Sequence, residues 1–90
     1  MPDRVLSFEN LISSDTEATE VIYDRKFIGP EPSPNVQITI DNGQAGDYYE
    51  YDYKDLEGFA IKFYDIDGVQ VSRQFDVAVK GYGSRHTVTI

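Results

Sequence analysis

Three short runs with large apolar side chains at every second position constrain this chain more than any other feature. They cover residues 36–40, 59–63 and 75–79, and glycines stand between them. Such spacing is typical of strands, whose successive side chains point to opposite faces. It predicts an all-β fold, an antiparallel β-sandwich of about six strands. The predicted inner face consists of Val36, Ile38, Ile40, Phe59, Ile61, Phe63, Phe75, Val77 and Val79.

Two pairs of residues ending in glycine predict tight turns between these strands. Asn42-Gly43 follows the first run, and Asp67-Gly68 follows the second. Asn and Gly accept the positive φ angles that tight hairpin turns require. We therefore expect positive φ at Asn42-Gly43. At Asp67-Gly68 we expect a two-residue hairpin that joins a strand over 58–66 to the segment beginning at Val69.

The remainder of the chain divides into an N-terminal segment, 1–20, and the sandwich domain, 21–90. Ninety residues suffice for one domain with a thin core. Within the domain, 20–28 and 86–90 are predicted as two further strands. The N-terminal segment is too apolar for a free tail, so we expect a strand, an arm or a docking peptide. Its candidate contacts with a partner or another protomer are Leu6, Phe8, Leu11 and Ile12.

The charge balance limits the partners that the chain is expected to bind. Sixteen acidic and 8 basic residues give a net charge of −8. Nucleic acid is a poor partner because its binding depends on Lys and Arg neutralising phosphates. No apolar run reaches the roughly 18 residues that span a bilayer, and no signal peptide is expected. The chain has no cysteine, so disulfides and thiolate metal sites are excluded.

The residues that could perform catalysis do not form a known pattern. His86 is the one histidine, and no Gly-x-Ser-x-Gly turn accompanies it. The carboxylates Glu50 and Asp52 share a strand face, which a solvated surface explains. Asp65 begins a calcium-loop pattern, but position 5 of that pattern is Val69, which has no oxygen in its side chain. We therefore predict no catalytic residue, metal site or cofactor, and expect a binding or structural module rather than an enzyme.

The most informative cluster is the run Asp-Tyr-Tyr-Glu-Tyr-Asp-Tyr over 47–53. In an unbroken strand, Tyr49, Tyr51 and Tyr53 share one face, and Tyr48, Glu50 and Asp52 lie on the other. Tyrosine has a large apolar ring and a polar tip, which suits it to interfaces. One interpretation makes the tyrosine row part of the core or of a subunit contact. The other makes a ligand site of Tyr49, Glu50, Tyr51, Asp52 and Tyr53, where rings stack on sugars and carboxylates accept hydrogen bonds from the sugar hydroxyls.

The stretch 23–83 resembles a known family in four pieces that follow one another in order. The pieces are Arg25-x-Phe27 with Pro-Asn-Val-Gln-Ile-Thr-Ile at 34–40, Ala-Gly-Asp-Tyr-Tyr at 45–49, Gly-Phe-Ala-Ile-Lys-Phe-Tyr-Asp at 58–65, and Val-Ser-Arg-Gln-Phe-Asp at 71–76 with Lys-Gly-Tyr-Gly at 80–83. Together they resemble the small β-sandwich of bacteriophage tail-fibre, tail-tip and host-specificity proteins. That module is itself similar to H-type lectins.

This resemblance implies a structural protein of a phage virion that takes part in host recognition. It would be a tail-fibre, fibre-tip or baseplate-associated module, with host surface glycan as the candidate ligand. The resemblance also implies a homo-oligomer, with a trimer favoured, that contacts other virion proteins. The protein would be made in the host cytoplasm and exposed on the particle. Two alternatives stay open: a capsid or tail decoration protein that binds only virion proteins, and a free-standing lectin.

Overall fold

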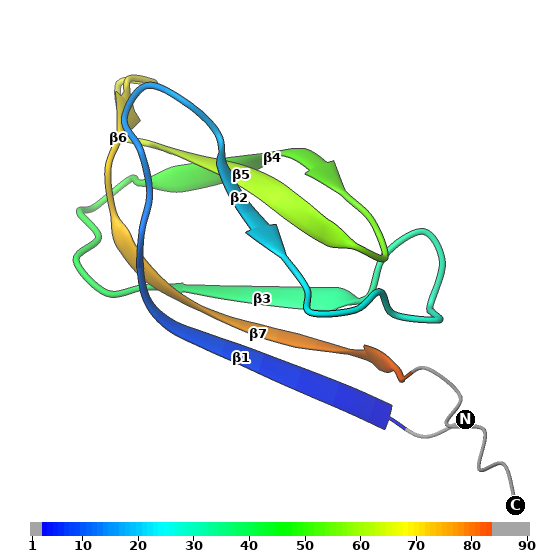
Figure 1. The fold of residues 1–90 in the computed structure, drawn as a ribbon. Helices are drawn as coiled ribbons and strands as arrows, with labels where there is room; N and C mark the ends of the chain where they lie inside the picture. Colours follow the sequence, from blue (N-terminus) through cyan, green and yellow to red (C-terminus); the bar gives the residue numbers. More distant parts are fainter. Residues whose placement is uncertain (1–2, 84–90) are drawn as a thin grey trace, which may run out of the picture.

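The chain forms two antiparallel β-sheets that pack face to face (Figure 1). The computed structural model describes residues 3–83. The strands are β1 (Asp3–Ile12), β2 (Thr19–Ile22), β3 (Asn35–Ile40), β4 (Tyr48–Lys54), β5 (Gly58–Tyr64), β6 (Gln70–Val71) and β7 (Gln74–Tyr82). The first sheet has the order β1-β7-β3, and the second has β2-β5-β4 with β6 also paired to β5. The predicted all-β antiparallel sandwich is confirmed.

The predicted inner face forms most of the core. The six predicted residues of β5 and β7 are buried, namely Phe59, Ile61, Phe63, Phe75, Val77 and Val79. Val36, Ile38 and Ile40 face the same core but are only half-buried, because β3 is an edge strand. The sequence pattern missed Tyr23 and Phe27, which are buried although they lie outside any strand.

The first strand belongs to the sandwich and runs along the whole length of β7. Its partners extend from Asp3 opposite Tyr82 to Ile12 opposite Gln74. A β-bulge interrupts this register between Phe8 and Leu11, where Asn10 has a φ of 59°. Asn tolerates this left-handed conformation better than most residues. The bulge therefore bends β1 without ending it.

The predicted strand over 20–28 is wrong beyond residue 22, because the chain crosses there from one sheet to the other. The Tyr23 amide donates to Glu57 O in the turn that joins β4 and β5, at 2.9 Å. Five residues later, the Ile28 amide donates to Tyr82 O on β7, at 3.0 Å. A segment that bridges two sheets cannot keep a ladder with either. The strand predicted over 86–90, with His86, lies outside the described residues.

The predicted turns are partly correct. Asn42-Gly43 does not adopt positive φ, because 41–47 is a connection between the sheets, and Gly46 takes the positive φ of 87° instead. Gly68 does adopt positive φ, 79°. The hairpin is longer than predicted, however: the Asp65 amide donates to Val69 O, so residues 66–68 form a three-residue loop. A glycine in the left-handed region commonly ends such a loop.

Replacing Gly68 with valine is expected to destabilise the protein by about 1 kcal/mol or more, because a β-branched side chain disfavours positive φ. For a domain of this size the unfolding temperature should fall by roughly 4–8 °C per kcal/mol. Thermal unfolding followed by circular dichroism measures the change. Gly68→Asn is the matched control, since Asn tolerates this conformation, and an equal loss in both variants would contradict the explanation.

Replacing Tyr23 with phenylalanine is expected to leave stability unchanged or to raise it by up to about 1 kcal/mol. The Tyr23 hydroxyl is buried, and it has no hydrogen-bond partner within the described part of the chain. Burial and the nearby Asp55 carboxylate raise the pKa of Tyr23 to about 12. Phenylalanine keeps the ring contact with Phe27, whose centroid is 5.1 Å away. A loss of stability in chemical denaturation would show that the hydroxyl contributes.

Candidate functional site

The tyrosine run lies on β4, at the edge of the second sheet. Tyr49 is opposite Phe63 and Tyr51 is opposite Ile61, so both tyrosines point towards the core. A register shift follows, and Tyr53 is opposite Ala60. The extra residue in β4 reverses the alternation from that point on. The prediction that Tyr49, Tyr51 and Tyr53 share one face is therefore wrong for Tyr53, which points outwards.

Tyr51 packs on the core, whereas Tyr49 lies at the margin of the core and stays 37% exposed. The Tyr51 ring meets Phe59 edge-on at 5.7 Å, and the Tyr49 ring lies 5.8 Å from Phe63. Burial, followed by the neighbouring Tyr49 hydroxyl, raises the pKa of Tyr51 above its ordinary value. Lys54 Nζ lies over the Tyr51 ring, 4.8 Å from its centroid. Tyr51 therefore supports the interpretation of the tyrosine row as core, and Tyr49 supports it only in part.

The outward side chains form a second surface, which we call the outer tyrosine face. It consists of Tyr48, Glu50, Asp52 and Tyr53 from β4, Lys62 and Tyr64 from β5, and Glu20 from β2. The Tyr48 and Tyr64 rings stack, with centroids 5.3 Å apart and planes inclined by 21°. Tyr48 remains 43% exposed, so this aromatic pair is partly open to solvent.

Acidic groups surround the aromatic pair along the same face. Asp52 Oδ1 lies 3.5 Å from Lys62 Nζ, and Glu50 is directly opposite Lys62. At the far end, Tyr53 Oη donates to Glu20 Oε2 at 2.8 Å. The Glu20 carboxylate accepts this hydrogen bond, which raises the pKa of Tyr53 to about 12. The face thus combines open aromatic rings with carboxylate acceptors.

The structure separates the residues that the sequence grouped together. Glu50, Asp52 and Tyr53 lie on the outer tyrosine face, whereas Tyr49 and Tyr51 lie behind it. Sequence spacing predicted that Tyr48 shares a face with Glu50 and Asp52, and the structure confirms this, although Tyr48 was not among the candidate binding residues. Tyr64 was missed, since only the pairing of β4 with β5 brings it beside Tyr48.

The structure also divides the four candidate contact residues of the N-terminal segment into partly buried and exposed ones. Leu6, Phe8 and Leu11 are partly buried against the core of their own chain. Ile12, at the end of β1, is 71% exposed. Of this set, Ile12 is the residue that is most open to a partner.

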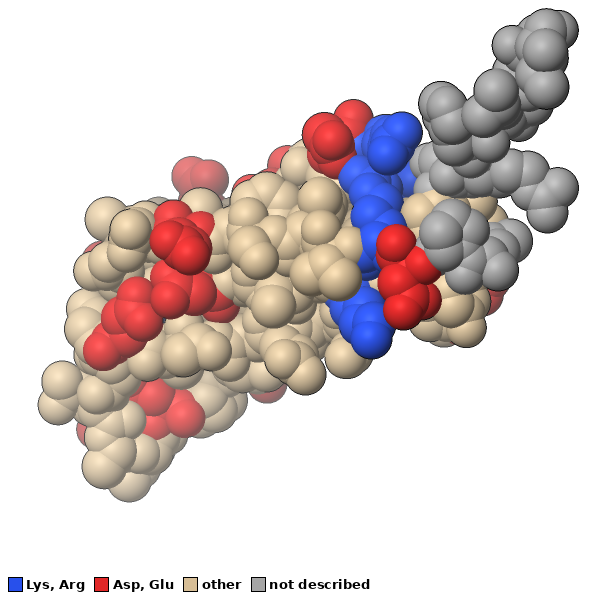
Figure 2. Space-filling model, turned by 90° about the horizontal axis from the view of Figure 1, so that it is seen from below, with Lys and Arg blue, Asp and Glu red and all other residues tan. Residues whose placement is uncertain are grey.

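A shallow depression of about 170 Å³ lies on the outer face of the first sheet. Its floor is Ala78, flanked in register by Ser7 on β1 and Gln37 on β3, with the carboxylates Glu9 and Asp76 farther along. Figure 2 shows this face of the molecule, with basic side chains in a narrow band that has acidic side chains on both sides of it. Because the lining comes from three distant segments, spacing along the chain gives no sign of the depression.

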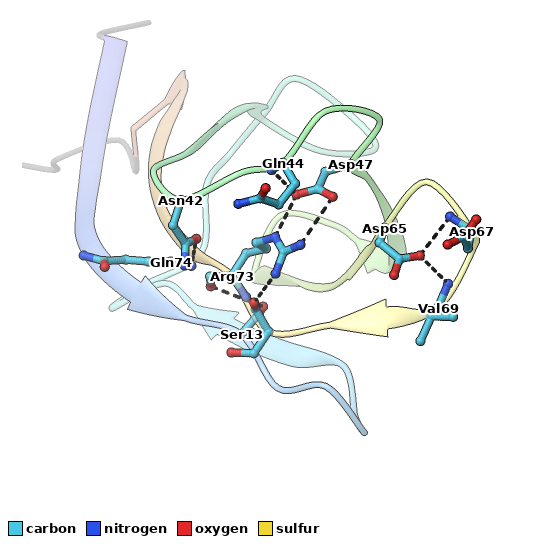
Figure 3. A network of polar contacts seen from close by, with 10 residues as sticks. Ser13, Asn42, Gln44, Asp47, Asp65, Asp67, Val69, Arg73 and Gln74 are labelled. Carbon is cyan, nitrogen blue, oxygen red and sulfur yellow. Dashed lines mark hydrogen bonds and ion pairs between the residues drawn. The ribbon is translucent and has the colours of Figure 1, made fainter.

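The densest polar cluster ties together three connections at one end of the sandwich (Figure 3). Arg73 Nε donates to Asp47 Oδ2 at 2.7 Å, and the Gln44 amide donates to the same oxygen at 2.7 Å. Ser13 Oγ accepts a bond from the Arg73 amide at 2.8 Å. The hydrogen bond from Arg73, followed by that from Gln44, lowers the pKa of Asp47. Since these groups satisfy one another, the cluster fixes loops and does not resemble a reactive site.

Within residues 3–83, no three His, Cys, Asp or Glu side chains are grouped so that they could hold a metal ion. The same residues contain no helix that is long and apolar enough to cross a membrane.

Comparisons with protein-family models, curated proteins and solved structures gave no match to this chain.

Replacing Asp47 with asparagine is expected to lower the unfolding temperature at pH 7, because Arg73 then loses its charged partner. Asp47 has a folded pKa below the ordinary 3.8, so its stabilising contribution is present above that pH. As the pH falls through the folded pKa, the contribution disappears. The difference between wild type and Asp47→Asn should shrink below pH 3.8 in thermal unfolding.

The matched control for this experiment is Asp67→Asn, which removes one carboxylate from an exposed position in the loop after β5. A small change at every pH is expected there. A wild-type advantage over Asp47→Asn that persists unchanged into strong acid would contradict the role assigned to the Asp47 charge.

Proposed function

We propose that this protein is a non-enzymatic binding module whose outer tyrosine face contacts a sugar. The observation that carries the proposal is the stacked pair of Tyr48 and Tyr64, which is partly exposed through Tyr48 and is followed along β4 by Glu50 and Asp52. The apolar face of a sugar ring can lie on such an aromatic surface, which offers contact area at little entropic cost because the rings are already held. Neighbouring carboxylates accept hydrogen bonds from the sugar hydroxyls.

The charge of the protein narrows the class of sugar. With a net charge of −8, the chain repels sialylated, sulfated and phosphorylated glycans. The acids of the outer tyrosine face strengthen this repulsion locally. We therefore propose a neutral or N-acetylated sugar, which is also the ligand class of the H-type lectins that the sequence resembles.

The proposed setting is a phage virion, as a tail-fibre, fibre-tip or baseplate-associated component that recognises a host surface. The support is the ordered set of sequence pieces over 23–83, together with a sandwich of the class that those pieces predict. A homo-oligomer, trimeric by the same resemblance, would present several copies of the face at once. Weak contacts to single sugars would then add up through multivalency.

The test is a glycan array that carries neutral, N-acetylated and sialylated sugars, followed by calorimetric titration of the strongest ligand. Binding to neutral or N-acetylated members is expected, and Tyr48→Ala should weaken it by at least about tenfold, or ~1.4 kcal/mol. Tyr48→Phe keeps the ring and should retain most of the affinity.

Tyr82→Ala is the matched control, because Tyr82 is also 43% exposed but lies at the end of β7 on the first sheet. Unchanged binding is expected there. A blank array, or an equal loss in Tyr48→Ala and Tyr82→Ala, would overturn the sugar-binding role. The capsid or tail decoration role, in which the protein contacts only other virion proteins, would then become the leading proposal.

A further inference from the structure

β3 forms one edge of the first sheet, and among the described strands it pairs only with β7. Its sequence, Asn-Val-Gln-Ile-Thr-Ile over Asn35–Ile40, contains no charged residue, and its register with β7 is unbroken. Such an edge presents a row of unpaired backbone groups that can template another strand. We infer that the free edge of β3 pairs with β3 of a second copy of this chain.

The other edges carry features that oppose strand addition. β1 contains the charged residues Asp3, Arg4 and Glu9 as well as the bulge at Asn10. β4 contains two acids, a terminal lysine and the bulge before Tyr53. β2 has only four residues, one of them Glu20. Charges, bulges and short strands are the usual means by which proteins protect their sheet edges. β3 has none of these protections: it carries no charged residue, it has no bulge, and with six residues it is longer than β2.

The backbone of β3 shows which groups are available at the free edge. The Asp41 amide donates to Gln74 O on β7, at 2.8 Å. In an antiparallel pair, alternate residues direct their N–H and C=O groups to the same neighbour. Gln37 and Thr39 therefore point to β7 like Asp41, whereas the N–H and C=O groups of the intervening residues point outwards. Those residues are Val36, Ile38 and Ile40.

One register uses all of these outward groups. With a two-fold axis at Ile38, Val36 of one copy lies opposite Ile40 of the other, and Ile38 lies opposite Ile38. Each of these pairs can exchange both backbone hydrogen bonds. In this register the side chains that point into the core of one copy lie beside those that point into the core of the other. On the outer face, Gln37 of one copy lies beside Thr39 of the other. Two first sheets would thus join into one continuous sheet with strand order β1-β7-β3-β3-β7-β1.

Burial and charge favour a second copy as the occupant. Val36, Ile38 and Ile40 are only half-buried in one copy, and the same residues of the second copy would cover part of their exposed surface. Where the two β3 strands meet, Asp41 of one copy would lie opposite the neutral Asn35 of the other copy. No two like charges therefore meet along this contact. The net charge of −8 on each copy opposes approach, and added salt screens that repulsion. We therefore expect a weak dimer that strengthens with salt.

This contact is separate from the proposed sugar site, because β3 belongs to the first sheet and the outer tyrosine face to the second. Either proposal can fail without the other. A two-fold contact also gives dimers and not the trimer implied by the sequence resemblance, so the mass of the assembly distinguishes the two.

The test is sedimentation velocity on the full chain, from about 10 µM to about 1 mM, at low and at moderate salt. A dimer fraction that rises with concentration and with salt is expected. Hydrogen exchange measured by NMR should show that the amides of Val36, Ile38 and Ile40 become protected as dimer forms. The amides of Gln37 and Thr39 face β7 and should be protected at every concentration.

The variant Gln37→Lys/Thr39→Lys places lysines opposite one another across the contact between the two β3 strands, on exposed positions that leave the core intact. It should weaken dimerisation at least tenfold. Val5→Lys/Ser7→Lys is the matched control: it adds the same charge to exposed positions on the other edge of the same sheet and should dimerise at least as well as wild type. A monomer at all concentrations, a trimer, or equal loss in both variants would overturn the inference.

Discussion

The fold depends on phenylalanine packing between two small sheets. Phe63 on β5 and Phe75 on β7 lie with ring centroids 4.9 Å apart, so a single aromatic contact joins the central strands of the two layers. A chain of 90 residues buries a limited share of its surface, and large rings supply much apolar contact from few positions. Apart from the buried Val21 on β2, the edge strands add half-buried side chains to this core, and both surfaces proposed for binding lie on or beside them.

An arginine closes each end of this aromatic core. At one end, the Arg4 guanidinium lies 4.4 Å from the Phe27 ring centroid and donates to Arg25 O at 2.8 Å. At the other end, Arg73 pairs with Asp47, whose side chain is only 3% exposed. Each arginine binds a connection that crosses between the sheets. Planar guanidinium groups suit both tasks, because they stack on rings and form two-point bonds with carboxylates.

The sequence predicted which side chains point into the core, because this depends on local alternation. It missed the features that depend on which strands pair and in what register. Period-two spacing identified the inward residues of β3, β5 and β7, because each of these strands keeps an unbroken alternation. The same spacing failed at Tyr53, since a bulge in β4 is visible only against its partner strand. Asn42-Gly43 reads as a hairpin turn in isolation, yet the chain there leaves one sheet for the other. The stacked partner of Tyr48 was likewise set by register and not by sequence.

The bulge in β4 also explains why the two sheets differ in what they can bind. By turning Tyr53 outwards, it lengthens the outer tyrosine face and brings the Tyr53 hydroxyl to Glu20 on the far strand. The same irregularity, with the charges beside it, hinders strand addition at this edge. β3 has neither bulge nor charge, and its regularity keeps its outward backbone groups aligned. The irregular strand β4 is thus suited to hold a ligand on its outer face, and the regular strand β3 is suited to pair with another protein strand at its edge.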